Sequence, residues 1–217
     1  MEVSTSFLSD KDYKKTILEL NMTNTDYIHF DVMDGKFVEN KNLSIKELIT
    51  YLDLSTKKND IHFMVNNPLK YIEKIYLYNI DYVTVHYEIK NLDKVIDKIK
   101  EYGLKVGVSL KPSTDVKEIF PYLDKINMVL IMSVVPGKSG QTFIEDSIDR
   151  VNELKEEIIK RKVSTKIEID GGINDSVIDK LSNVDIVVSA SYILNDYNNI
   201  DKIKRISAWK STFLLYF

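Results

Sequence analysis

Histidine and aspartate side chains open or end several short apolar segments of this chain. His29 and Asp31 lie two residues apart in one segment, so both point to the same face if that segment is a strand. His62 opens a second segment, His86 ends a third and Asp170 ends a fourth. Imidazole and carboxylate groups together suit a borderline divalent metal ion (Zn, Fe(II), Mn or Co) better than Mg or Ca. A lone histidine in an apolar strand is more often a hydrogen-bonded core residue, so a metal site requires these segments to converge.

Eight apolar runs have the length and composition of β-strands. They are Val3–Phe7, Tyr27–Asp31, Ile61–Val65, Tyr82–His86, Lys105–Leu110, Met128–Met132, Lys166–Asp170 and Ile186–Ser189. Longer segments with apolar residues at steps of three and four separate them, which is typical of amphipathic helices. The clearest of these are Asp10–Leu20, Leu69–Tyr78, Leu92–Tyr102 and Ser147–Lys160. Strands that alternate with helices predict parallel βαβ units.

Eight such units in 217 residues predict an α/β fold, a single (β/α)8 TIM barrel with a parallel eight-stranded sheet. The alternative is an open doubly wound sheet. The barrel is favoured because the count is eight and because no dinucleotide-type glycine fingerprint follows the first strand. We expect residues 1–217 to form one barrel domain. Since active sites of such barrels lie at the carboxyl ends of the strands, we expect the histidines and aspartates to meet there.

Glycine is scarce, with seven residues in the whole chain, and several of them follow the last predicted strands. Gly137–Gly140 follows the sixth strand, and Gly171 with Gly172 follows the seventh. Barrel enzymes often bind phosphate with the loops after strands seven and eight. Glycine lets backbone N–H groups approach an anion closely. The glycine positions therefore predict a phosphate site at the same end of the barrel.

The composition excludes several classes of protein. Hydrophobic residues make up 44% and charged residues 29% of the chain, and the net charge of −3 argues against a nucleic-acid partner. Cysteine is absent, which excludes a disulfide framework, a zinc ribbon and a cysteine nucleophile. No apolar run approaches the roughly 20 residues of a membrane helix and the start has no signal-peptide pattern, so we expect a cytoplasmic protein with no membrane partner. The apolar end, Ser211–Phe217, is expected to cover either a barrel end or a subunit contact.

Several stretches of the sequence occur in the same order as in one known family. They are residues 6–9 (SFLS), 27–38 (YIHFDVMDGKFV), 61–65 (IHFMV), 82–88 (YVTVHYE), 105–108 (KVGV), 129–137 (VLIMSVVPG) with Gly140 and Gln141, and 167–173 (IEIDGGI). Together they extend from about Ser4 to Asp201 and resemble the ribulose-phosphate 3-epimerase family. Ordered matches over nearly the whole chain make the resemblance specific.

The resemblance implies an isomerase that interconverts D-ribulose 5-phosphate and D-xylulose 5-phosphate in the pentose phosphate pathway. It implies one divalent metal ion held by His29, Asp31, His62 and Asp170, with Asp31 and Asp170 also forming the acid/base pair. It implies substrate contacts at Ser6, Met33, Met64 and Met132. It implies phosphate contacts at Gly137, Lys138, Ser139, Gly140, Gly171, Gly172, Ala190 and Ser191. Many barrels of this kind associate, so the expected partners are a sugar phosphate and further copies of the chain.

Epimerisation at C3 explains these residue types. A proton α to the C2 ketone leaves one face of the sugar and a proton returns to the other face, which suits two carboxylates from different strands. The intermediate is a cis-enediolate, whose developing charge a metal ion stabilises as a Lewis acid. Methionine side chains are polarisable and have no acidic proton, so they can pack against the enediolate without protonating it. The remote phosphate supplies binding energy that holds the reacting carbon in place.

Three segments depart from the family pattern. Lys138 and Ser139 stand where the family usually has Phe-Gly, Ala190 stands in place of a glycine, and Glu39 stands in place of a proline. These changes spare the metal ligands but lie in the substrate envelope, so two alternatives stay open. One is an allulose-6-phosphate 3-epimerase with the same mechanism, and the other is a non-catalytic barrel that binds a sugar phosphate. Related barrels that decarboxylate or perform aldol chemistry carry Asp-x-Lys-x-x-Asp at strand three, where this chain reads HFMVN.

Overall fold

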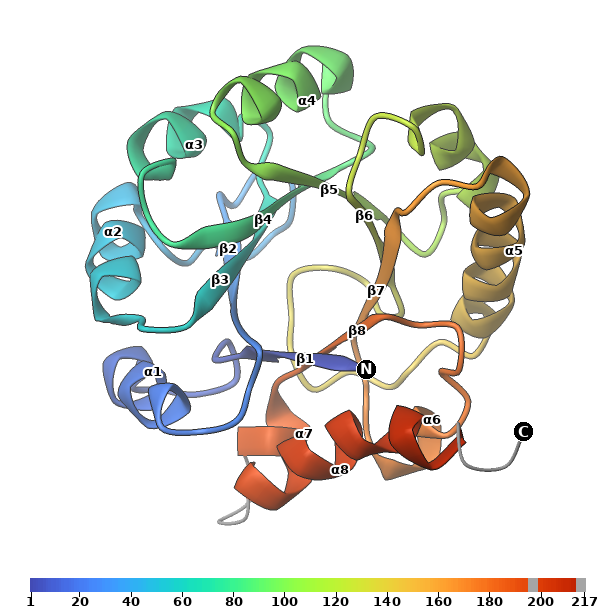
Figure 1. The fold of residues 1–217 in the computed structure, drawn as a ribbon. Helices are drawn as coiled ribbons and strands as arrows, with labels where there is room; N and C mark the ends of the chain where they lie inside the picture. The colour runs from blue at the N-terminus through green and yellow to red at the C-terminus, as the bar shows by residue number, and fades with distance from the viewer. Residues whose placement is uncertain (195–198, 214–217) are drawn as a thin grey trace.

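The computed structural model describes residues 1–194 and 199–213, and its eight parallel strands close into a barrel. Figure 1 looks along the barrel, with the strands in the inner ring and the helices around them. The strands are β1 (Glu2–Ser6), β2 (Tyr27–Met33), β3 (Lys58–Met64), β4 (Ile80–His86), β5 (Lys105–Leu110), β6 (Met128–Met132), β7 (Lys166–Asp170) and β8 (Ile186–Ser189). They pair in sequence order, and β1 closes the ring against β8. The predicted (β/α)8 barrel is confirmed.

Strands β5 to β8 begin and end at the predicted residues, and the ends of β1, β2 and β4 differ from prediction by no more than two residues. Strand β3 differs most, at its start. It begins at Lys58, three residues before the predicted start, because Asn59 and Asp60 are polar but completely buried. His62 therefore lies towards the carboxyl end of β3 and not at its start. Asp31 of β2 is its register partner, so the two side chains occupy the same level of the barrel.

Helices and one 3-10 helix lie between the strands and after β8. They are α1 (Tyr13–Asn21), α2 (Ile45–Leu54), α3 (Leu69–Ile75), α4 (Leu92–Glu101), η1 (Val116–Tyr122), α5 (Asp146–Arg161), α6 (Asp175–Ile178), α7 (Ser191–Leu194) and α8 (Asn199–Phe213). The apolar stripe of α4, which includes Val95 and Ile99, is buried as its spacing predicts. The start of α2 is fixed by a capping box, in which the side chains of Ser44 and Glu47 each accept a hydrogen bond from the other's backbone N–H.

The interior of the barrel changes from apolar to polar along the strands. Near the amino-terminal ends, Tyr27, Tyr82, Met128 and Ile186 form a separate apolar cluster. Further along the strands lies a layer of buried polar side chains, which includes Ser4, His29, Asp60, Thr84 and Glu168. The main apolar core lies outside this barrel interior, between the sheet and the helices. The polar layer therefore lies directly beneath the side chains at the carboxyl ends of the strands.

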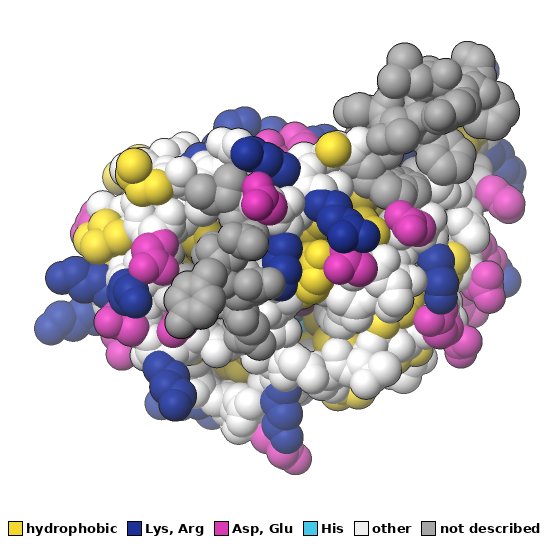
Figure 2. Space-filling view, turned by 90° about the horizontal axis from the view of Figure 1, so that it is seen from below, with side chains coloured by type: hydrophobic (Ala, Val, Ile, Leu, Met, Phe, Trp, Pro, Cys, Tyr) yellow, Lys and Arg dark blue, Asp and Glu magenta, His cyan; other side chains and the backbone are white. Residues whose placement is uncertain are grey.

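Charged side chains are distributed over the face of the molecule that Figure 2 shows. On the face in Figure 2, basic and acidic side chains are intermixed, with no extended area of one sign. No helix among residues 1–194 and 199–213 is both long enough and apolar enough to cross a membrane. The side chains at 209–213 and all of residues 214–217 lie outside the described part, so the expectation for Ser211–Phe217 concerns residues that the structure does not describe.

Candidate active site

The four predicted metal ligands converge at the carboxyl ends of three strands. His29 and Asp31 come from β2, His62 comes from β3, and Asp170 ends β7. Each offers one ligand atom, and these atoms all lie within 4.8 Å of one another. Both imidazoles are fully buried, whereas the carboxylates line an open cavity. Any substrate must therefore approach the cluster from the carboxylate side.

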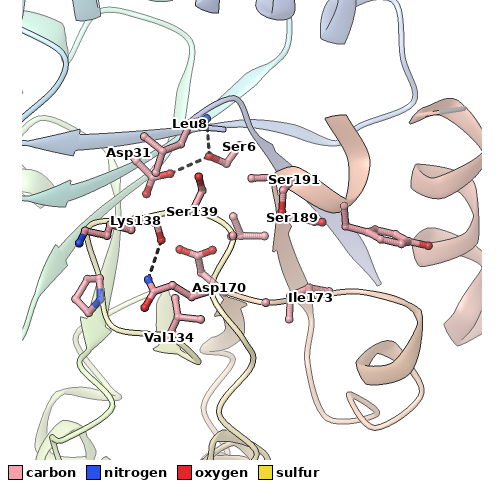
Figure 3. A pocket seen from close by; sticks show the side chains of 18 of the residues that line it. Ser6, Leu8, Asp31, Val134, Lys138, Ser139, Asp170, Ile173, Ser189 and Ser191 are labelled. Atoms are coloured by element: carbon pink, nitrogen blue, oxygen red, sulfur yellow. Dashed lines mark hydrogen bonds between the residues drawn. The ribbon is translucent and has the colours of Figure 1, made fainter. Parts of the chain in front are cut away.

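The two carboxylate oxygens of Asp31 have different surroundings. Its Oδ2 accepts a hydrogen bond of 2.8 Å from the hydroxyl of Ser6, which is drawn in Figure 3. Its Oδ1 lies 3.4 Å from Nε2 of His29 and 3.3 Å from Nδ1 of His62. One oxygen thus faces the imidazoles, and the other is held by a hydroxyl beside the cavity.

The loop after β2 is tied to the backbone of Asp31. The Asn42 side chain donates to the carbonyl of Asp31 and accepts from the N–H of Met33, both at 2.8 Å. Asn40 donates a hydrogen bond of 2.7 Å to the carbonyl of Gly137 in the loop after β6. The two asparagines therefore join Asp31 to the glycine-rich loop and hold both at the mouth of the barrel.

His29 is oriented by a carboxylate on its far side. Its Nδ1 lies 2.6 Å from Oδ2 of Asp60, which also accepts a hydrogen bond of 2.9 Å from Ser4. Burial lowers the pKa of His29, but the charges of Asp60 and Asp31 outweigh burial and hold this pKa well above its usual range. Burial and the adjacent Asp60 carboxylate hold the pKa of Glu168 well above its usual range. Because Nδ1 is committed to Asp60, Nε2 is the atom that His29 presents to the cluster.

The donor set fits a divalent cation. Nε2 of His29 is buried, and among the described residues it has no hydrogen-bond partner, although Oδ1 of Asp31 faces it. Two imidazole nitrogens and two carboxylates form the mixed ligation that Zn, Fe(II), Mn and Co accept. The charges of Asp60 and Asp31, which raise the pKa of His29, favour a second proton on the imidazole of the protein alone. Binding of a cation at Nε2 would therefore release a proton.

The two aspartates differ in protonation. Burial raises the pKa of Asp31, but the charge of His29, the largest opposing cause, helps to bring this pKa far below its usual range. Burial and, second, the charge of Asp31 raise the pKa of Asp170 to about 7. One carboxyl group is therefore ionised while its partner can hold a proton near neutrality. Two carboxyl groups whose pKa values are driven apart are the usual form of a general acid and base.

One cavity of about 410 Å³ connects the aspartates with the glycine-rich loops. In Figure 3, the side chains of Asp31 and Asp170 point into it from opposite sides. All of the residues predicted to contact phosphate line this cavity: Gly137, Lys138, Ser139, Gly140, Gly171, Gly172, Ala190 and Ser191. The topology thus brings loops separated by up to about fifty residues of sequence to the two catalytic candidates.

Three of the four predicted substrate contacts also line the cavity, namely Ser6, Met64 and Met132. Met33 is not among the described residues that line it. It pairs in register with Met64 and is only 1% exposed, so it is buried in the strand end beside the cavity wall.

Two cavity residues are ones to which the sequence assigned no functional role. Tyr192 of α7 and Lys202 of α8 both line the cavity. Nζ of Lys202 donates a hydrogen bond of 2.7 Å to the carbonyl of Tyr192 and lies 4.4 Å from the centre of its ring. Asn174, which also lines the cavity, had a detectable signal, because it follows the Gly171-Gly172 pair and caps α6.

Behind His62, a chain of polar contacts leads to Glu88. Nε2 of His62 faces Nε2 of His86 at 2.9 Å, and Nδ1 of His86 faces Oε2 of Glu88 at 3.2 Å. Oε1 of Glu88 accepts from the backbone N–H of Lys111 at 3.0 Å and from the hydroxyl of Thr114 at 2.5 Å. Burial, the largest cause, lowers the pKa of His86 to about 4. Burial raises the pKa of Glu88, but hydrogen bonds from His86, Thr114 and Lys111 outweigh burial and lower it to about 2.

A sequence profile described as the Ribulose-phosphate 3 epimerase family matches residues 2–194. The chain belongs to this family. It is 35% identical to the ribulose-phosphate 3-epimerase of Helicobacter pylori strain J99 over 197 residues, which cover 89% of this chain and 90% of that protein. It is 39% identical to the ribulose-phosphate 3-epimerase of Aquifex aeolicus over 171 residues, 77% of each chain. The resemblance in the sequence and the predicted isomerase class are confirmed.

Solved structures of other members of the barrel fold are also similar to this epimerase-family chain. The 3-hexulose-6-phosphate synthase of Salmonella typhimurium superposes with a TM-score of 0.67 at 16% identity, covering 98% of this chain and 99% of that one. The N-(5'-phosphoribosyl)anthranilate isomerase of Pyrococcus furiosus gives a TM-score of 0.61 at 15% identity and 96% coverage of both. At such identities the likeness concerns the barrel fold alone.

Replacing Gly172 with alanine should destabilise the epimerase-family barrel by about 3 kcal/mol. Gly172 has φ +66°, and an added Cβ would lie 2.4 Å from the backbone nitrogen of Phe143, which cannot yield easily. Gly103→Ala is the matched control, because Gly103 has φ +73° but no atom within 4 Å of an added Cβ. We expect that control to cost about 1 kcal/mol from strain alone. Urea unfolding measures both values, and equal losses would contradict the close contact.

The stability of this family member should fall in acid because of Glu88. Its folded pKa of about 2 lies below the ordinary value of 4.5. Its contribution, on the order of 3 kcal/mol, is therefore complete above about pH 4.5 and lost as the pH falls towards 2. In urea unfolding from pH 7 to pH 3, the advantage of the wild type over Glu88→Gln should shrink below about pH 4.5. The control is Glu101→Gln, at an exposed glutamate of α4, whose free energy of unfolding should change with pH as that of the wild type does. If the free energies of wild type and Glu88→Gln differ by the same amount at every pH, the prediction is contradicted.

Proposed function

We propose that this protein interconverts D-ribulose 5-phosphate and D-xylulose 5-phosphate by moving a proton at C3. The observation that carries the proposal is the entry of Asp31 and Asp170 into one cavity from opposite sides, beside the glycine-rich loops. A base on each face lets the sugar stay in place while its C3 configuration inverts. The family relatives named ribulose-phosphate 3-epimerase support the same reaction.

The proton steps balance between the two carboxyl groups. The ionised aspartate takes the C3 proton, and the C3–H electron pair forms the C2–C3 double bond of a cis-enediolate while negative charge moves to the C2 oxygen. The protonated partner then gives its proton to the opposite face of C3, and the C2 ketone re-forms. The reverse reaction exchanges the two roles. Ser6 holds Oδ2 of Asp31 beside the cavity during these steps.

We propose that His29, Asp31, His62 and Asp170 hold one divalent ion of Zn, Fe(II), Mn or Co. When bound, such an ion supplies Lewis-acid stabilisation of the negative charge on the substrate oxygens. Oδ1 of Asp31, which faces both imidazoles, is the oxygen suited to ligation, and this leaves Oδ2 for the proton. Asp60 keeps Nε2 of His29 directed at the cluster.

The remaining cavity residues bind and shield the substrate in this proposal. The thioethers of Met64 and Met132 present a polarisable surface without acidic protons to the planar intermediate. Met33 backs the Met64 side of the wall. Backbone N–H groups of the loops at 137–140, 171–172 and 190–191 surround the phosphate. Lys138 adds a positive charge to the lining of the cavity.

One assay tests the reaction and the substrate together. The protein is stripped of metal, supplied with Zn, Fe(II), Mn or Co, and offered D-ribulose 5-phosphate, D-allulose 6-phosphate or unphosphorylated D-ribulose. We expect xylulose 5-phosphate to form, and the sugar without phosphate to react far more slowly because it lacks the remote binding energy. Turnover of the six-carbon sugar alone would replace the substrate and keep the mechanism. Binding of both phosphates without turnover would overturn the enzyme proposal.

We also propose a single-domain cytoplasmic enzyme that associates with copies of itself. The net charge of the chain is only −3, and without cysteine it needs no oxidising compartment for disulfide formation. One relative, from Arabidopsis thaliana, is described as chloroplastic, so family members work in more than one compartment. Light scattering of the purified protein measures its mass, and a mass near the 25.2 kDa of one chain would contradict association.

A further inference from the structure

We propose that Glu88, acting through His86, fixes the tautomer of His62 and so makes Nδ1 the atom with which His62 binds a metal ion. Glu88 and His86 are positioning residues in this scheme, because neither is among the described residues that line the catalytic cavity. The inference rests on the proposed function, since it concerns one of the proposed metal ligands.

The direction of the hydrogen bonds starts at Glu88. The backbone N–H of Lys111 can only donate, and it points at Oε1 of Glu88 over 3.0 Å. The hydroxyl of Thr114 lies against the same oxygen. An ionised carboxylate can only accept hydrogen bonds, so each group that contacts Glu88 must donate one. The contact between Oε2 of Glu88 and Nδ1 of His86 therefore requires the hydrogen to be on Nδ1.

The same logic passes from His86 to His62. A neutral imidazole with hydrogen on Nδ1 has a lone pair on Nε2. Nε2 of His86 faces Nε2 of His62 at 2.9 Å, so the one hydrogen between them belongs to His62. His62 is then left with a lone pair on Nδ1, which faces Oδ1 of Asp31 at 3.3 Å. Two lone pairs at that separation repel each other unless a cation lies between them.

The surroundings bury the two histidines of this chain of contacts and hold the segment around Glu88 in place. His86 is completely buried, and the ring of Phe37 covers it with 4.6 Å between ring centres. Arg150 donates hydrogen bonds to the carbonyls of Lys111 and Thr114 at 3.0 and 3.1 Å. These bonds fix the segment that holds Glu88. Water therefore has little opportunity to replace His86, and Glu88, whose side chain is 22% exposed, is held by the contacts of its two oxygens.

The tautomers can be read directly by NMR. The chain has three histidines, so two-bond 1H–15N spectra of protein labelled at histidine contain three resolved systems. In both metal-free and zinc-loaded wild type, we expect hydrogen on Nδ1 of His86 and on Nε2 of His62. Because this measurement uses the wild type, it does not depend on the folding of any variant. Hydrogen on Nε2 of His86, or on both of its nitrogens at pH 7, would overturn the proposal.

Glu88→Gln is the variant that should reverse the tautomers. The amide oxygen of glutamine must accept from Lys111 and Thr114, so its NH2 group turns towards Nδ1 of His86. His86 then carries its hydrogen on Nε2, and His62 carries its hydrogen on Nδ1, at the metal side. We expect zinc affinity, measured by competition with a chromophoric chelator, to fall about 10–100-fold. Glu101→Gln, at an exposed glutamate of α4, should leave the spectra and the zinc affinity unchanged.

The outcomes separate this inference from the proposed function. Unchanged tautomers in folded Glu88→Gln, or zinc affinity equal to that of Glu101→Gln, would overturn the positioning role. If neither wild type nor variant binds zinc, iron, manganese or cobalt, the proposed metal is wrong, and so is Nδ1 as a ligand atom. If the wild type binds metal with the assigned tautomers but turns over no sugar phosphate, the inference stands and the proposed reaction fails.

Discussion

Asp31→Asn and Asp170→Asn should each lower kcat by about 10³-fold or more, while each keeps the ability to exchange a proton at C3 with solvent. General acid–base groups typically contribute about 10²–10⁴-fold, and here each carboxyl serves one face of the sugar. In deuterium oxide, a variant with one remaining base should incorporate deuterium at C3 of one epimer without forming the other. The two variants should act on opposite epimers.

The control for this experiment is Asp97→Asn, an exposed aspartate of α4 far from the cavity, which should retain wild-type kcat. Bound metal is measured in every sample, because both aspartates are also proposed ligands. Either active-site variant retaining kcat within about tenfold of wild type would contradict the acid/base assignment. Exchange of both epimers by one metal-loaded variant would contradict the assignment of one base to each face.

Removal of metal should abolish turnover and destabilise the protein. A ligand present at about 100 times its Kd stabilises the folded state by roughly 2.7 kcal/mol, so readdition of Zn or Co should raise the unfolding temperature as well as restore activity. Mg and Ca should do neither at the same free concentration, since two of the four donors are imidazoles. Activity and calorimetric unfolding temperature are measured on the same stripped samples.

His62→Gln provides the control for metal removal, because it deletes one proposed ligand and leaves the carboxylates. Its unfolding temperature should no longer respond to Zn or Co at concentrations that shift the wild type. Full turnover by wild-type protein after exhaustive stripping would rule out the metal proposal. An equal thermal response in His62→Gln would mean that the ions act at another place.

Part of the active site can be predicted from the sequence because it depends on simple periodicities. His29 and Asp31 share a face because side chains alternate along a strand. Asp170 ends its strand, and active sites of such barrels lie at the carboxyl ends of the strands. The four strands from β5 to β8 agree with their predicted ends, as their apolar runs are flanked by glycine, lysine and turn residues. These features follow from local chain geometry.

The third strand illustrates where local reasoning fails. Hydropathy predicts a start at Ile61 because Asn59 and Asp60 are polar, yet both are buried, and Asp60 lies in the barrel interior. Residues distant in the chain stabilise these polar groups. His29 and Ser4 contact Oδ2 of Asp60, and the Asn59 side chain donates a hydrogen bond to the carbonyl of Asn79. Only the closed sheet shows that His62 lies level with Asp31.

By itself, the sequence determined the barrel, the order of its strands, the histidines and aspartates at their ends and the glycines of the phosphate loops. Period, strand count and residue type suffice for these, because each is a property of a short segment. The tertiary structure decided which nitrogen each histidine presents, that Asp60 and Glu88 stand behind the ligands, and that Lys202 of the last helix reaches the cavity. Those properties arise from hydrogen bonds and contacts between residues far apart in the chain, and no local pattern encodes their direction.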